Sequence, residues 1–146
     1  MLKGMKIANL AIISFAVTAP MAHVLALPGQ FDLDGSLWLT VQQQLYRGWG
    51  AVFGPVALFA VLVTLFLVWL RRANAAAFRA SLVAVFAYAA MLGVFFFFNV
   101  SANFAFDNWP DFRWRWETGH VIAAGLSFVG WLALLWASFA DRKPAA

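Results

Sequence analysis

The chain has 146 residues, of which 64% are hydrophobic and only 11% charged, and its mean hydropathy is +0.81. Soluble domains are about 45–50% apolar and about 25% charged, so this composition excludes a soluble enzyme and a disordered segment. The net charge of +4 results from ten Lys and Arg against six Asp and Glu residues. The basic residues form no continuous stripe, which excludes a nucleic-acid-binding module. The absence of cysteine excludes disulfides, zinc–thiolate sites and iron–sulfur clusters.

Four apolar stretches are each long enough to cross a bilayer as a helix, which takes about 20 residues. They are residues 7–27, 50–70, 80–98 and 121–140. Lipid offers no hydrogen-bond partners to the backbone, so helices are the form that such stretches take. We therefore expect one all-α domain, residues 1–146, that forms an integral membrane four-helix bundle of up-down-up-down topology.

The first stretch carries His23 near its far end, three residues after Pro20. Pro20 removes one helix hydrogen bond and frees the carbonyl of Ala16, so a free acceptor and an imidazole share one face. A histidine at membrane depth is typical of a ligand site, a proton relay or a metal site, and a structurally paired histidine near the interface is equally compatible. If a signal peptidase cleaved after Ala22, Pro20 would occupy position −3 of the cleavage site. Proline there disfavours cleavage, so we expect this stretch to remain a span.

Residues 28–49 repeat apolar side chains at helical spacing, with Gln42 and its neighbours mainly on the other face. Asp34 or Ser36 can cap the start of such a helix. We expect a short amphipathic helix at the membrane interface, which is either a simple connector or a lid over a pocket.

Residues 99–120 are dense in polar and aromatic side chains, whereas the connections expected on the inner side of the membrane are plain. We therefore expect any chemical site at the end of the bundle where the third span ends and the fourth begins. Asn99 and Asn103 lie four residues apart, and they can either bind a ligand or hydrogen-bond between helices.

Arg113 and Arg115 alternate with Trp114 and Trp116. Guanidinium groups in such a pattern can stack on indole rings, hold an anionic group, or pin the connection to the interface. The candidate ligand-binding residues of this region are Asn99, Asn103, Trp109, Arg113, Arg115 and Trp116.

Glu117 and His120 lie three residues apart, so on a helix their side chains project together. With His23 they can form a catalytic cluster or a metal site for zinc or non-heme iron, and the two histidines can ligate a heme. Alternatively, Glu117 caps a helix N-terminus or pairs with Arg113.

The basic residues predict the orientation, because cytoplasmic connections are enriched in Lys and Arg. The two longer connections, residues 28–49 and 99–120, together hold only three Lys and Arg residues. We expect both termini in the cytoplasm and the chain in the inner (plasma) membrane. The basic residues on the cytoplasmic side are then Lys3, Lys6, Arg71, Arg72, Arg79, Arg142 and Lys143.

The segments AHVLALPGQFDLDGSLWLTVQQQLYRGWG, NVSANFAFDNW and FRWRWETGH resemble the anthrone-oxygenase-like family of small four-helix membrane proteins. The resemblance implies a polar site where the third span ends and the fourth begins, and some relatives are linked to the oxygenation of polycyclic anthrones. The chain departs from the family in its aromatic run 95–98 and its Trp-rich connection. The resemblance is most specific at Asn99, Asn103, Trp109, Arg113, Trp116 and His120.

Two functions fit these observations. The first is a membrane protein that binds a hydrophobic small molecule, or that serves as an accessory or scaffold subunit for a membrane-protein partner or a homo-oligomer. The second is a membrane oxidoreductase for an aromatic or quinone-like substrate, in which the candidate catalytic residues are His23, Glu117 and His120. Both remain open at this point, and with them a metal or heme cofactor.

Overall fold

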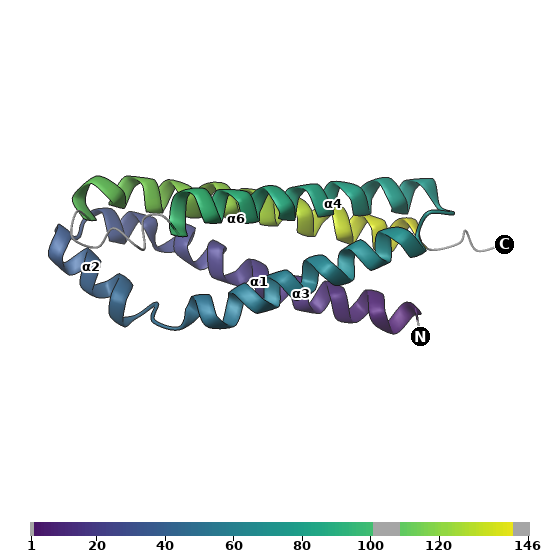
Figure 1. The fold of residues 1–146 in the computed structure, drawn as a ribbon, viewed down its shortest axis with the longest axis horizontal. Coiled ribbons are helices and arrows are strands. Elements are labelled where there is room, and N and C mark those ends of the chain that lie inside the picture. Colours follow the sequence, from purple (N-terminus) through teal and green to yellow (C-terminus); the bar gives the residue numbers. More distant parts are fainter. Residues whose placement is uncertain (1, 101–108, 142–146) are drawn as a thin grey trace.

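The computed structural model describes residues 2–100 and 109–141, with the side chains of 3–100 and 112–141. Every regular element in this part of the chain is helical (Figure 1), which confirms the predicted all-α fold. The elements are α1 (Leu2–Phe31), α2 (Gly35–Gln44), α3 (Trp49–Leu70), α4 (Ala75–Val94), the π-helix η1 (Phe95–Val100) that continues α4, and α6 (Trp109–Ala140).

The four long helices run along the molecule in alternating directions, as predicted (Figure 1). The start of α1 and the end of α6 lie at one end, called here the terminus end, and α2 lies at the opposite end, called the α2 end. The most extensive packing is between α4 and α6, and α1 contacts both α6 and α3.

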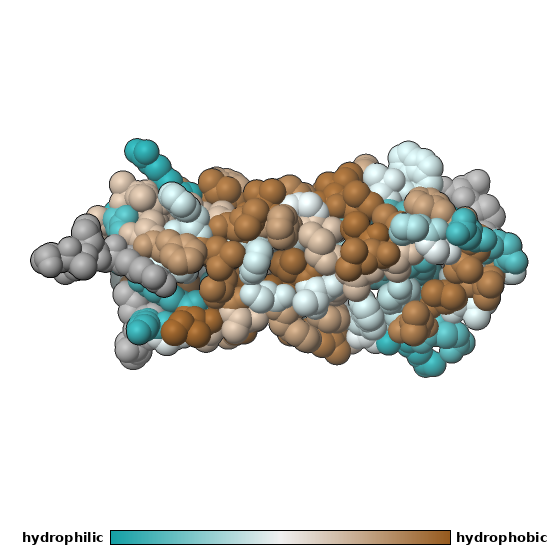
Figure 2. Space-filling model, turned by 180° about the vertical axis from the view of Figure 1, so that it is seen from behind, coloured by the Kyte–Doolittle hydropathy of each residue, from teal (hydrophilic) through white to brown (hydrophobic). Residues whose placement is uncertain are grey.

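Each long helix is long and apolar enough to cross a membrane, and the candidate spans are Lys3–Phe31, Trp49–Leu70, Ala75–Val100 and Phe112–Ala140. Figure 2 shows apolar side chains over the middle of one face and polar side chains toward both ends. Large apolar residues such as Leu25, Phe86 and Trp136 are exposed on the bundle. The chain is therefore a small multi-pass membrane protein whose apolar flanks contact lipid.

The last helix begins earlier than the sequence predicted. We expected the fourth span to start at residue 121, but α6 starts at Trp109, so residues 109–120 are helical and not part of a connection. Pro110 is compatible with this start, because N–H groups in the first turn of a helix make no intrahelical hydrogen bond and the missing N–H of proline therefore costs nothing there. The early start places Glu117 two turns inside α6, so this carboxylate does not cap the helix N-terminus.

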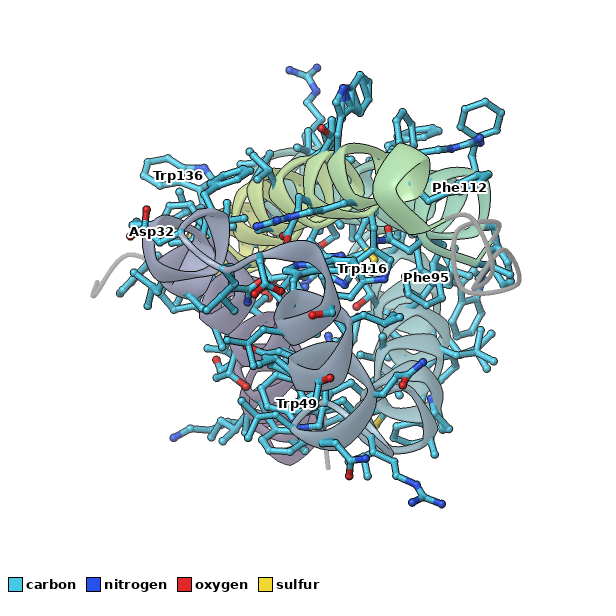
Figure 3. All side chains as sticks on the ribbon, turned by 90° about the vertical axis from the view of Figure 1, so that its left-hand side faces the viewer. Asp32, Trp49, Phe95, Phe112, Trp116 and Trp136 are labelled. Atoms are coloured by element: carbon cyan, nitrogen blue, oxygen red, sulfur yellow. The ribbon has the colours of Figure 1, made fainter. Side chains whose placement is uncertain are left out.

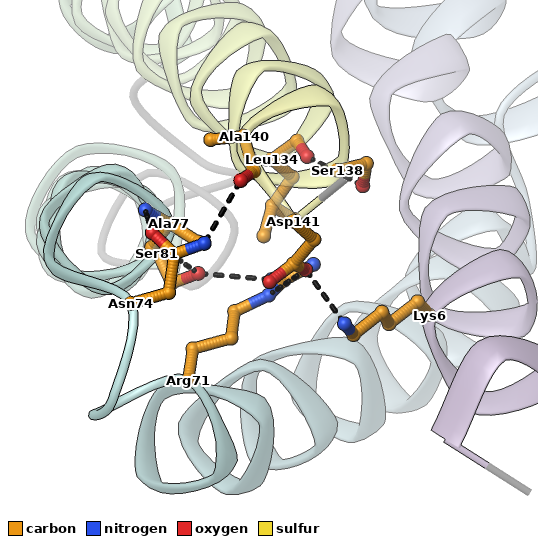
Figure 4. Close-up of polar contacts among 9 residues, drawn as sticks. All are labelled: Lys6, Arg71, Asn74, Ala77, Ser81, Leu134, Ser138, Ala140 and Asp141. Carbon is orange, nitrogen blue, oxygen red and sulfur yellow. Dashed lines mark hydrogen bonds and ion pairs between the residues drawn. The ribbon is translucent and has the colours of Figure 1, made fainter. Parts of the chain in front are cut away.

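A polar cluster ties the spans together at the terminus end (Figure 4). Asp141 accepts from both Arg71 Nε and Lys6 Nζ, each at 2.8 Å. Arg71 is only 3% exposed and also donates to Ser81 Oγ at 2.9 Å. Asn74 caps α4 through the Ala77 amide and donates to the carbonyl of Ala140 at 2.8 Å. This cluster fixes the terminus end, and the cavity described below lies toward the α2 end.

Candidate functional site

A cavity of about 470 Å³ lies between α1, α3, α4–η1 and α6, in the half of the bundle toward the α2 end. This volume falls within the roughly 300–1,000 Å³ of small-molecule sites. Nearly all of its wall is apolar, and the polar lining side chains are His23, Trp49, Tyr88, His120 and Ser127.

The two histidines meet at this cavity. The ring centroids of His23, on α1, and His120, on α6, lie 4.3 Å apart, with 53° between the ring planes. The ring of His23 also lies 4.3 Å from Tyr46, 5.5 Å from Trp49 and 5.0 Å from Trp116, measured between centroids. Figure 3, viewed from the α2 end, shows Trp49 and Trp116 approaching the interior from α3 and α6. The imidazole pair is therefore enclosed by aromatic rings.

Asn99 of η1 holds His120 in place. The Nδ2 atom of Asn99 contacts His120 Nδ1 and donates to the carbonyl of Trp116 at 2.9 Å. His120 Nδ1 also lies 2.9 Å from that carbonyl, so Nε2 is the ring nitrogen left for other partners. A π-helical turn such as η1 is often found at functional sites.

Gly119 allows η1 to approach α6 this closely. A Cβ at residue 119 would lie 2.5 Å from Asn99 Oδ1 and 2.6 Å from the Cβ of Phe98. Only glycine therefore fits where the amide of Asn99 meets the last span.

Two side chains that line the cavity each have a buried polar atom without a hydrogen-bond partner among the described residues, Nδ1 of His23 and Oη of Tyr88. His23 is 5% exposed and Tyr88 4% exposed. An unpaired buried polar group costs on the order of 1–3 kcal/mol, so a bound oxygen-bearing molecule at either atom would recover that free energy.

Glu117 faces α2 and not the histidines. Its Oε1 accepts from the indole N–H of Trp38 at 2.6 Å, and both residues are buried. Arg113 donates to the carbonyls of Leu33 and Gln30, which ties the end of α1 and the turn before α2 to α6. Within residues 2–100 and 109–141, no three His, Asp or Glu side chains are grouped so that they could hold a metal ion.

A second set of hydrogen bonds closes the α2 end beside His23. Gln42 of α2 donates to Gln30 Oε1 at 3.1 Å, and Gln30 donates to the Tyr46 hydroxyl at 3.2 Å. Asp34 accepts from the amide of Leu37 at 2.8 Å, which confirms it as the predicted N-cap of α2. The amphipathic helix is therefore joined to the bundle above the imidazole pair.

The remaining predicted site residues are Arg115, Asn103 and Trp109. Arg115 donates to the carbonyl of Phe97 at 2.7 Å and lies over that ring, so it supports η1 from outside the cavity. Asn103 lies outside the described residues, and Trp109 is described only by its backbone in the first turn of α6.

Sequence reasoning missed the part of the wall that comes from α3 and α4. Tyr88 carried a signal, because it is the one tyrosine in the apolar stretch 80–98. A Cβ at Gly130 would lie 2.7 Å from Tyr88 Cζ, so this glycine admits the tyrosine ring against α6. Gly50 and Gly54 carry no side chain from which a site could have been predicted.

Comparison of the chain with protein-family models, with curated proteins and with solved structures gives no match. The function is therefore argued from the geometry of the site.

Proposed function

We propose that the chain binds a hydrophobic small molecule that fills the cavity and hydrogen-bonds through an oxygen-bearing head group to the His23–His120 pair. The observation that carries this proposal is the buried Nδ1 of His23, which has no partner among the described residues and belongs to a side chain lining an apolar cavity. A hydroxyl group both donates and accepts, so it suits either tautomer of this ring.

The surroundings of the pair favour a flat aromatic head group. Beside the two histidines, the cavity is lined by the rings of Trp49, Phe53, Tyr88, Phe95 and Phe96. An aromatic ring among them gains free energy by stacking or edge-to-face contact. A phenol-like or quinone-like ring therefore matches both the shape and the polarity of this end of the cavity.

The test compares two probes that differ by one hydroxyl group, para-nonylphenol and nonylbenzene, binding to the purified protein in lipid nanodiscs. We expect the phenol to bind at least about fivefold more tightly, which corresponds to about 1 kcal/mol for one hydrogen bond. His23→Leu should abolish this preference. Equal binding of the two probes by the unsubstituted protein would refute the proposal.

Ser127→Ala is the matched control. Ser127 also lines the cavity, but its hydroxyl already donates to the carbonyl of Ala123 at 2.7 Å. Its removal should leave the preference for the phenol unchanged.

A chemical step at the same site is the second candidate, supported by the unpaired nitrogen of His23 and by the resemblance to anthrone-oxygenase-like proteins. In this proposal the imidazole accepts a proton from the acidic ring CH₂ group of an anthrone-like substrate, and the resulting carbanion reacts with dioxygen. The CH₂ group becomes a carbonyl with one oxygen atom of O₂, and the second oxygen atom leaves as water with both hydrogens.

Oxygen uptake matched to anthraquinone formation from anthrone tests this second proposal. The rate should fall on the order of a hundredfold in His23→Leu, as for loss of a general base, and should be unchanged in Ser127→Ala. Uptake that does not depend on His23 would contradict it.

A further inference from the structure

The cavity is open on one side. The exposed residues among its lining show where this opening lies. The lining residues from α1 and α6 are all buried or half-buried, and so are those from α4. The exposed ones come only from α3 and η1, and they are Gly50, Gly54, Pro55, Leu58 and Phe96. The opening therefore lies between the first half of α3 and the π-helix.

Two glycines keep the α3 side of this opening bare. Gly50 and Gly54 are one helical turn apart, so they lie on the same face of α3. A Cβ added to either residue would meet no atom within 4 Å. No side chain from α4 or η1 therefore covers this strip of α3 backbone.

The opening leads to the bilayer and not to water. Gly50 and Gly54 lie within the candidate span Trp49–Leu70, and Phe96 lies within Ala75–Val100. Leu58 and Phe96 at its rim are 52% and 63% exposed, as expected of side chains in contact with lipid. The end of the cavity nearest α2 is instead held by the bonds from Trp38 to Glu117 and from Gln30 to Tyr46.

We propose that the ligand is dissolved in the membrane and enters sideways between α3 and η1, with its head group reaching the histidine pair and an apolar tail left in the opening. This inference rests on the proposed function and adds the class of ligand: a single-tailed molecule with a ring-shaped, oxygen-bearing head, delivered from the lipid phase.

The first experiment locates the tail. The probe is para-nonylphenol with a photoreactive diazirine at the end of its chain, added to the protein in nanodiscs, and adducts are mapped by mass spectrometry. We expect adducts at the rim, on Leu58, Phe96 and their neighbours. Adducts concentrated on α2 would overturn lateral entry.

The second experiment blocks the opening. The chain has no cysteine, so Gly54→Cys offers a single thiol that can carry a methyl or a benzyl group. We expect the benzyl adduct to lower photolabelling at least about fivefold relative to the methyl adduct. The matched control is Gly125→Cys, because Gly125 is also exposed, meets nothing within 4 Å and does not line the cavity.

The outcomes separate the two proposals. If para-nonylphenol still binds more tightly than nonylbenzene but the benzyl group at residue 54 has no effect, lateral entry is wrong and the binding function stands. If the unsubstituted protein shows no preference between the two probes, the binding function itself fails, and this inference fails with it.

Discussion

His23 and His120 stand in ring contact at 4.3 Å, although they come from the first and the last membrane span. Their environments differ, because Asn99 contacts Nδ1 of His120 whereas Nδ1 of His23 has no partner among the described residues. The pair therefore combines one fixed imidazole with one that has a nitrogen available to a ligand.

We predict that Asn99→Ala weakens para-nonylphenol binding as well as the fold. The substitution removes the amide that orients His120 and leaves the Trp116 carbonyl with one donor fewer. Unfolding in mixed micelles should become easier by about 1–3 kcal/mol. The control is Asn9→Ala, which breaks the buried bond to Thr64 and should cost similar stability with no effect on binding. Unchanged binding in Asn99→Ala would contradict this role.

We predict different effects of the same substitution at two glycines of α6. Gly119→Ala places a Cβ 2.6 Å from that of Phe98 and should destabilise the fold by on the order of 1–3 kcal/mol. Gly125→Ala meets nothing within 4 Å and should be neutral or slightly stabilising, because alanine favours the helix. Thermal unfolding of the two variants checks this, and equal melting temperatures would count against the close approach of η1 to α6.

At the terminus end, we predict that Arg71→Met is more damaging than Lys6→Met. Both side chains bind Asp141 at 2.8 Å, but the Arg71 side chain is 2% exposed and that of Lys6 20%. Loss of Arg71 also leaves Ser81 without this partner and should cost about 1–3 kcal/mol, whereas loss of the more exposed pair should cost less than about 1 kcal/mol. Chemical unfolding measures both values, and the reverse order would contradict the arrangement in Figure 4.

The cap of α2 should depend on pH. The amide of Leu37, and then the hydroxyl of Ser36, lower the pKa of Asp34 below its ordinary value by binding the charged carboxylate. This contribution is complete above the ordinary pKa and is lost as the pH falls through the lowered one. We therefore expect the start of α2 to loosen in acid, which NMR of its backbone amides would detect. Asp34→Asn keeps a capping side chain and should remove the pH dependence, and a persistent dependence would point to another group.

The orientation can be tested with single cysteines, since the chain has none. We propose that both termini are cytoplasmic, so Gln43→Cys in α2 should react with an impermeant maleimide on intact cells. Ala73→Cys, in the turn between α3 and α4, should react only after the cells are permeabilised. Both positions are exposed, so the opposite pattern would mean the inverted orientation.

The fold was largely predictable because hydropathy alone marks four spans. The start of α6 was missed because its first turns carry charged residues whose partners lie on other elements. Arg113, for example, donates to carbonyls at the end of α1 and in the turn before α2.

The site was predictable only in part. The alternating directions of the spans allowed His23 to meet His120, and they do meet. Helical spacing also grouped Glu117 with His120, but spacing cannot reveal that the indole of Trp38, far away in the sequence, binds this carboxylate. The uncovered α3 backbone at Gly50 and Gly54 could not be predicted from the sequence. The opening of the cavity depends on which part of α3 the neighbouring helices leave exposed.

The wide turn at Phe95–Val100 has a consequence for register. A π-helix bonds each residue to the fifth along instead of the fourth, so it delays the rotation of the side chains by about one residue, or roughly 100°. Had α4 continued as an α-helix, the side chain of Asn99 would be rotated away from His120. The π-helical turn therefore changes which side chain of the span faces α6, and it brings the amide of Asn99 to His120.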